Sequence, residues 1–191
     1  MEFRSDTIIL EKDLTLLDRF VLDFTARMDV PYVIISGYVA ILFGRSRNSE
    51  DVDLFLQRVD EKEFARLWAR LLPVFECINA PVADAYTGYL LNNNAIRFSR
   101  RNEYIPNMEV KFPKNALDEW ALTHRRKVLL NGQVLWISPI ELQIAYKLFL
   151  GSEKDIEDAR FLHRTFEGRL DAALLEESFK KLGVNGLRRY L

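Results

Sequence analysis

The spacing of apolar residues changes near Ser138, and this change limits the folds open to the chain. Before it, segments that alternate apolar and polar side chains are interspersed with helical patterns, as expected for a sheet that carries helices. After it, every patterned segment has helical spacing. This order predicts an α+β fold, a mixed twisted sheet flanked by helices with a helical C-terminal part. We therefore predict an α/β core over 1–137 and a helical region over 138–191 that packs on it.

The individual elements follow from the same patterns. Helices are predicted over 12–28, 38–43, 61–72, 115–124, 138–150, 153–166 and 170–182. Strands are predicted over 32–35, 51–56, 86–91, 95–98, 108–112, 128–130 and 134–137. Asn92-Asn93-Asn94 and Asn131-Gly132 are turn sequences, so each is expected to close a hairpin. Ser138 is expected to cap the helix that follows, with Pro139 at its first position.

Charge and cysteine content restrict the class of protein. The chain has 27 basic and 28 acidic residues, so no field of the whole protein attracts nucleic acid or anionic membrane. The single cysteine, Cys77, cannot form an internal disulfide, which fits a reducing compartment. Charged side chains interrupt the apolar runs near the N-terminus, and no segment is apolar enough to span a bilayer. These features predict a cytoplasmic protein with no membrane partner.

Two carboxylates on one predicted strand are the first candidate site. Asp51 and Asp53 are two residues apart, so both project from the same face of the strand over 51–56. Carboxylates this close repel each other unless a cation lies between them, and Mg²⁺ is a hard cation that such oxygens hold. The same pair on an exposed strand is also compatible with two solvated acids, and the bare motif favours that interpretation.

The turn before this strand is a candidate phosphate site. Ser36-Gly37 lies where a buried strand gives way to a short helix, so backbone N–H groups are expected to point outward there. An ordinary strand–helix turn with a serine cap explains the dipeptide equally well. What distinguishes the chain is the succession of strand, Ser-Gly, helix, polar loop and a strand that opens with Asp51. It predicts that phosphate-binding backbone and metal-binding carboxylates lie at neighbouring ends of adjacent strands.

This succession resembles the DNA polymerase beta-like nucleotidyltransferase superfamily. In that superfamily a Gly-Gly or Gly-Ser at a helix start is followed, about a dozen residues later, by an acid-hydrophobic-acid strand. The resemblance implies that Ser36 and Gly37 bind phosphate and that Asp51, Asp53 and Glu109 hold the metal. Glu109 stands where aspartate is more usual. Tyr38 replaces a small residue and is expected to lie close to the triphosphate.

The C-terminal third resembles AbiEii-type toxin nucleotidyltransferases. In those proteins a serine-started helix carries a Lys-Leu pair, and an Arg-Asp-x-x-Asp motif follows on the next helix. Lys147-Leu148 matches the first motif, and 154–158 matches the second with Lys154 in place of the arginine. The resemblance implies that Lys147 is a catalytic and nucleotide-binding cation, and that Asp158 orients it or the nucleotide.

The same residues have simpler interpretations. Lys147 has the surroundings of a lysine whose stem lies on the core while its ammonium reaches a polar surface. Asp155 and Asp158 would stabilise a helix N-terminus as well as a ligand. Arg45 and Arg47, in the loop before the acidic strand, are equally compatible with phosphate binding and with solvated loop charges.

The function expected from these residues is transfer of a nucleotidyl group from an NTP to an acceptor. Mg²⁺ or Mn²⁺ is the expected cofactor, and the acceptor classes left open are RNA such as tRNA, protein and small molecules. The toxin resemblance adds a cognate antitoxin as a candidate partner. The alternative is a nucleotidyltransferase-fold module that binds nucleotide or protein without catalysis, which the departures at Tyr38 and Glu109 favour.

Overall fold

The computed structural model describes residues 1–4 and 6–184. In this part of the chain, a sheet of nine strands runs in the order β1-β2-β8-β9-β3-β4-β7-β6-β5. Three neighbouring pairs are parallel (β2 with β8, β9 with β3, and β4 with β7) and the others are antiparallel, so the sheet is mixed, as predicted. Its strands are β1 (Glu2–Arg4), β2 (Thr7–Leu10), β3 (Tyr32–Ile35), β4 (Asp51–Leu56), β5 (Phe75–Cys77), β6 (Ile96–Arg100), β7 (Asn107–Lys111), β8 (Arg126–Leu130) and β9 (Gln133–Ile137).

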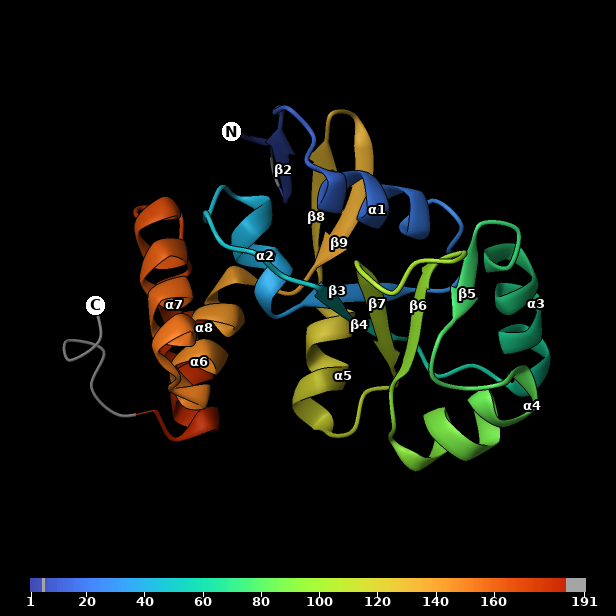
Figure 1. Ribbon diagram of the computed structural model, residues 1–191. Coiled ribbons are helices and arrows are strands. Elements are labelled where there is room, and N and C mark those ends of the chain that lie inside the picture. Colours follow the sequence, from blue (N-terminus) through green and yellow to red (C-terminus); the bar gives the residue numbers. More distant parts are fainter. Residues whose placement is uncertain (5, 185–191) are drawn as a thin grey trace.

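Helices cover the sheet and form the C-terminal part (Figure 1). They are α1 (Leu16–Thr25), α2 (Gly37–Leu42), α3 (Glu61–Leu71), α4 (Val82–Asp84), α5 (Ala116–Thr123), α6 (Ile140–Leu150), α7 (Glu153–Thr165) and α8 (Ala172–Leu182), with a π-helical turn at Ala85–Tyr89 and a 3-10 turn at Leu90–Asn92. The predicted α+β class is confirmed. None of the described helices is both long and apolar enough to cross a membrane.

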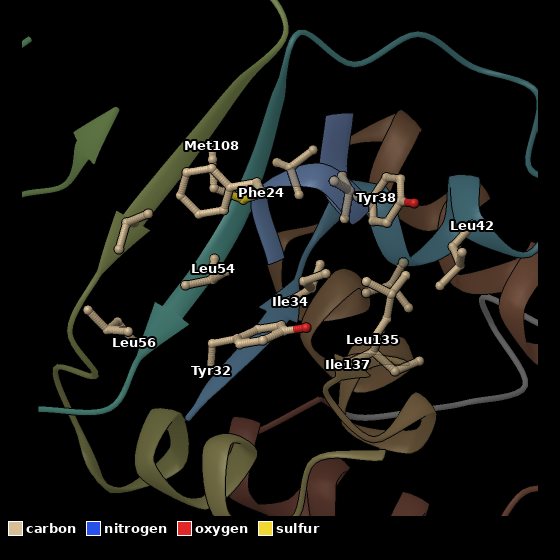
Figure 2. Packing of buried hydrophobic residues seen from close by; sticks show 14 of the residues in the cluster. Phe24, Tyr32, Ile34, Tyr38, Leu42, Leu54, Leu56, Met108, Leu135 and Ile137 are labelled. Atoms are coloured by element: carbon tan, nitrogen blue, oxygen red, sulfur yellow. The ribbon is translucent and has the colours of Figure 1, made fainter. Parts of the chain in front are cut away.

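Alternation along β3 and β4 gives the sheet two different faces. Ile34, Leu54 and Leu56 point into the main core, which they share with Phe24 of α1 (Figure 2). Val33 and Phe55 point to the opposite face and pack there against Leu122 of α5. Since Asp51 and Asp53 alternate with Val52 and Leu54, they belong to the α5 face.

Tyr38 belongs to the main core, so the expectation that it lies near a bound triphosphate is wrong. Its side chain is fully buried, and its hydroxyl donates a hydrogen bond to Asp18 Oδ1 at 2.8 Å. Asp18 also completes the capping box of α1 with Thr15 and pairs with Lys12 at 3.0 Å. The hydrogen bond from Tyr38 of α2 to Asp18 of α1 therefore joins these two helices.

Several predicted elements need correction. Residues 86–92 are helical rather than a strand, because Asn92 Nδ2 donates to the carbonyls of Thr87 and Gly88 and so closes a helix end instead of a hairpin. β1, β2 and β5 were not predicted from the sequence pattern. The sixth helix begins at Ile140, with Pro139 as its N-cap residue. Ser138 does not cap it but accepts a hydrogen bond from Gln143 instead.

The buried Asp18 gives the fold a testable pH dependence. Burial alone would raise the pKa of Asp18, but hydrogen bonds from Thr15, Lys12 and Tyr38 outweigh it and lower that pKa. A lowered pKa stabilises the fold above the unfolded pKa of about 3.9, and this stability is lost as the pH falls through the folded pKa.

We predict that Tyr38→Phe lowers the free energy of unfolding by about 1.5–3 kcal/mol at neutral pH, because a hydrogen bond to a charged group is lost. The loss should shrink only as the pH falls through the lowered folded pKa of Asp18, where the carboxylate becomes protonated. Urea unfolding at pH 7 and at about pH 2 measures both values, with the exposed Tyr104→Phe as control. An equal loss at both pH values would contradict the role of the Asp18 charge.

Candidate functional site

The register of three strands brings the acidic residues together. Asp53 pairs with Ile35 on β3 and, on its other side, with Glu109 on β7. Residues paired directly across a sheet project from the same face, so Asp53 and Glu109 lie side by side although 56 positions separate them in sequence. Asp51 projects from that face one pleat earlier, opposite Asn107. Ser36 directly follows Ile35, so the Ser-Gly turn begins beside Asp53.

A lysine that sequence reasoning missed lies between the two carboxylates. Lys111 is two residues after Glu109 on β7, and its Nζ is 2.7 Å from Asp53 Oδ1 and 3.2 Å from Glu109 Oε1. The other oxygen of Glu109 binds Arg97 on β6 at 2.8 Å. The sequence could have predicted this position of Lys111, because the alternation of side chains along 107–111 places 109 and 111 on one face of the strand. The expected repulsion between carboxylates is thus offset by protein cations.

Partial burial strengthens these ion pairs. Burial alone would lower the pKa of Lys111, but the charges of Asp53 and Glu109 outweigh it, so that pKa is raised. Burial would raise the pKa of Glu109, but the charge of Lys111, together with Arg97, lowers it instead. The Glu109 carboxylate and the Lys111 ammonium are therefore both ionised at neutral pH.

The carboxylates fit a divalent cation by their chemistry and their convergence. Asp53 and Glu109 supply hard oxygen ligands, and both already hold one cation, the Lys111 ammonium. Asp51 is more exposed, and its Oδ1 lies 3.3 Å from Ser49 Oγ. Among the described residues, no three His, Cys, Asp or Glu side chains are already arranged to hold a metal. A divalent ion at Asp53 and Glu109 would therefore take the place of Lys111.

The Ser36-Gly37 turn has an unusual backbone. Ser36 has φ 65° and ψ −137°, a conformation that non-glycine residues rarely adopt and that costs about 1–3 kcal/mol. Its side chain makes no capping hydrogen bond, so the interpretation as a serine cap is wrong. A Cβ atom at Gly37 would lie only 2.0 Å from a terminal nitrogen of Arg47. The guanidinium of Arg47 therefore lies directly against the start of α2.

Lys147 belongs to a second, buried ion network. Its ammonium is 2.7 Å from Asp155 and 3.0 Å from Asp158, and its side chain is only 2% exposed. Asp158 also lies 3.5 Å from Arg45 and 3.3 Å from Arg47, and Arg45 pairs with Glu157. The expectation of a lysine that extends to the surface is thus wrong.

A cavity of about 300 Å³ opens on the acid face between the sheet and the helices α5 and α6. Asp53, Lys111 and Ser36 line it together with apolar side chains that include Phe55 and Leu142. Arg45, Arg47, Lys147 and Asp158 do not line this cavity. The predicted site residues therefore form two groups, the acid face beside the cavity and the buried network behind α2. Arg47 connects them, since it contacts both Gly37 and Asp158.

The buried network predicts a large stability effect at Lys147. Lys147→Ala should lower the free energy of unfolding by about 3–5 kcal/mol, because it leaves two buried carboxylates with less compensation. The double variant Lys147→Ala, Asp158→Asn should lose less than the sum of its single variants. Urea unfolding of the four proteins measures this coupling.

The exposed Lys154→Ala, seven residues further on, is the matched control and should leave unfolding unchanged. Additive single effects at Lys147 and Asp158 would show that the two charges do not stabilise each other.

Comparison with known proteins was informative at the level of structure. No protein-family model and no curated protein sequence matches the chain. The fold is similar to that of an antigenic nucleotidyltransferase-like protein from Paracoccidioides brasiliensis, with a TM-score of 0.53 and 17% identity over 85% of this chain and 83% of that one. It is also similar to ANT(2")-Ia, solved in complex with adenylyl-2"-tobramycin, with a TM-score of 0.53 and 13% identity over 87% of this chain and 95% of that one.

At these identities the similarity shows the fold alone. Each of the two solved structures aligns with at least 85% of this chain. The α+β architecture observed here is therefore that of the nucleotidyltransferase fold.

Proposed function

We propose that the chain is a metal-dependent nucleotidyltransferase that acts on a nucleoside triphosphate at the acid face. The observation that carries the proposal is the convergence of Asp53 and Glu109 beside the strained Ser36-Gly37 turn and an adjoining cavity. Strain at a turn beside a charged cleft is typical of functional sites. The similarity in fold to ANT(2")-Ia, whose structure holds an adenylylated aminoglycoside, supports the reaction class.

Each residue group has a distinct role in this proposal. Asp51, Asp53 and Glu109 would hold the divalent ion, which supplies charge stabilisation to the transferring phosphate when bound. The backbone at Ser36 and Gly37 would bind the other phosphates through its N–H groups. The carboxylate of Glu109 would accept the proton of the attacking hydroxyl. Its lowered pKa makes it a weak base while Lys111 and Arg97 remain in contact with it.

The buried network would act on the nucleotide indirectly. Lys147 and Asp158 hold each other and both arginines, and Arg47 contacts the start of α2. We therefore assign this network the role of fixing the Ser-Gly turn. In this assignment Lys147 is a positioning residue, in place of the direct phosphate contact that the resemblance implied.

The acceptor remains open among RNA, protein and small molecules, since none of the described contacts selects one. The proposals of a cognate antitoxin and of a cytoplasmic location rest on the sequence alone. The alternative function is a module that binds nucleotide without transferring it. The ion pairs of Glu109 favour this alternative, because they weaken the carboxylate proposed as the base.

Ligand-induced stabilisation tests the site without knowledge of the acceptor. At a hundred times its dissociation constant, Mg²⁺-NTP should stabilise the wild type by roughly 2.7 kcal/mol. For a chain of this size that is a melting shift of several degrees. Asp51→Asn with Asp53→Asn should abolish the shift. Without ligand this double variant should melt slightly lower, because Lys111 loses a partner.

Asp13→Asn, a change to an exposed carboxylate outside the site, is the control and should respond as the wild type does. Equal responses of the wild type and the double variant would rule out the acid face as the nucleotide site. Transfer of label from an α-labelled NTP to lysate or RNA then separates the two functions, because the binding module shifts in melting temperature but transfers nothing.

A further inference from the structure

We infer that Lys111 is an internal counter-ion of the Asp53–Glu109 pair, and that a divalent cation binds there only by displacing it. The inference rests on the metal site of the proposed function and names the residue that controls access to it. Nothing in the superfamily pattern described above assigns a role to this position.

Geometry is the first argument. The Lys111 ammonium contacts both carboxylates, at 2.7 and 3.2 Å, and so occupies the point on which their oxygens converge. Mg²⁺ binds oxygen ligands at about 2.0–2.1 Å and would need the same point. A divalent ion and the ammonium therefore cannot both lie between Asp53 and Glu109.

Accessibility is the second argument. The three side chains are partly exposed to solvent: 19% of Lys111, 23% of Asp53 and 17% of Glu109. A cation can reach them from the cavity, which Asp53 and Lys111 line. Lysine is flexible over four carbons, and the ring of Phe55 lies 5.8 Å from its Nζ, so the side chain can leave along an apolar wall.

Charge is the third argument. Three carboxylates on the face, at Asp51, Asp53 and Glu109, meet two protein cations, Lys111 and Arg97. This near balance leaves the nucleotide-free face with little attraction for a further cation. Replacement of one ammonium by a divalent ion adds positive charge at the acid face, where the proposed nucleotide brings its phosphates. Metal and nucleotide should therefore bind together more strongly than either binds alone.

The variant Lys111→Met tests this competition, because methionine keeps an unbranched apolar stem and removes the charge. Titration calorimetry of nucleotide-free protein with MnCl₂ should show 10–100-fold tighter binding than in the wild type, a range typical of changes next to metal ligands. Without Mn²⁺ the variant should melt lower than the wild type, since the carboxylates then repel each other, and Mn²⁺ should reverse the loss.

Lys114→Met is the matched control, because Lys114 lines the same cavity but forms no ion pair with any described residue. Its affinity for Mn²⁺ should equal that of the wild type. A second measurement needs no variant: Mg²⁺ added with an NTP should shift the Lys111 ¹³Cε resonance of the wild type and leave that of the exposed Lys62, on α3, in place.

Equal Mn²⁺ affinity in the wild type and Lys111→Met, or no binding to either, would overturn the inference. If Lys111→Met does not fold, the resonance of Lys111 in the wild type decides, and no shift on addition of Mg²⁺ and NTP would overturn the inference. Tighter Mn²⁺ binding without any label transfer would support the counter-ion and remove the transferase proposal. Label transfer with equal Mn²⁺ affinity in the wild type and Lys111→Met would support the transferase proposal and overturn the counter-ion inference.

Discussion

The parallel register between β4 and β7 determines most of what this molecule can do chemically. It places Asp53 opposite Glu109. Because side chains two residues apart on a strand share a face, Lys111 lies on the same face and contacts both carboxylates. A shift of one residue would turn Glu109 and Lys111 to the core face and leave Asp53 without a partner. The register is strongly specified, because the alternate residues Val52, Leu54, Met108 and Val110 are all buried on the other face.

The ionisable residues form two groups with different physical characters. The acid face is partly exposed, and its charges can exchange partners with a ligand that enters the cavity. Lys147 and Asp158, at the centre of the second network, are closed to solvent, so loss of either one leaves a buried charge with less compensation. Arg47 is shared between them through its contacts with Gly37 and Asp158. In the proposed function, the network of Lys147 and Asp158 holds the backbone of the Ser36-Gly37 turn in place through Arg47.

Local sequence patterns correctly predicted the elements whose conformation depends on neighbouring residues. The hairpin at Asn131-Gly132 formed because both residues adopt positive φ, as its turn type requires. The acidic alternation at Asp51 and Asp53 correctly predicted a strand, and Phe55, two residues later, is buried on the same face as the acids. The sequence pattern also placed the Ser-Gly turn beside that strand, and the β3–β4 pairing confirms this.

The wrong predictions concern side chains whose positions depend on residues that are distant in the sequence. Tyr38 points to the core because Asp18, twenty residues earlier, offers a buried hydrogen-bond acceptor. The run of asparagines ends a helical segment instead of a strand, and in that segment Tyr86 packs against Phe64 and Phe112, which are distant in sequence. The resemblance paired Lys147 with Asp158, and the two are in contact, but the local pattern gave no sign that the lysine is buried, because both of its partners lie on the next helix.

Paramagnetic broadening tests the central claim most directly, because it locates the metal–nucleotide complex on the protein. The measurement is an amide NMR spectrum of the isotope-labelled chain with Mn²⁺ and a non-hydrolysable ATP analogue. The account predicts that the amides around Ser36, Asp53 and Glu109 broaden first, while those of α8 (Ala172–Leu182) remain sharp. Broadening centred on another surface, with the resonances of β4 and β7 unaffected, would contradict it.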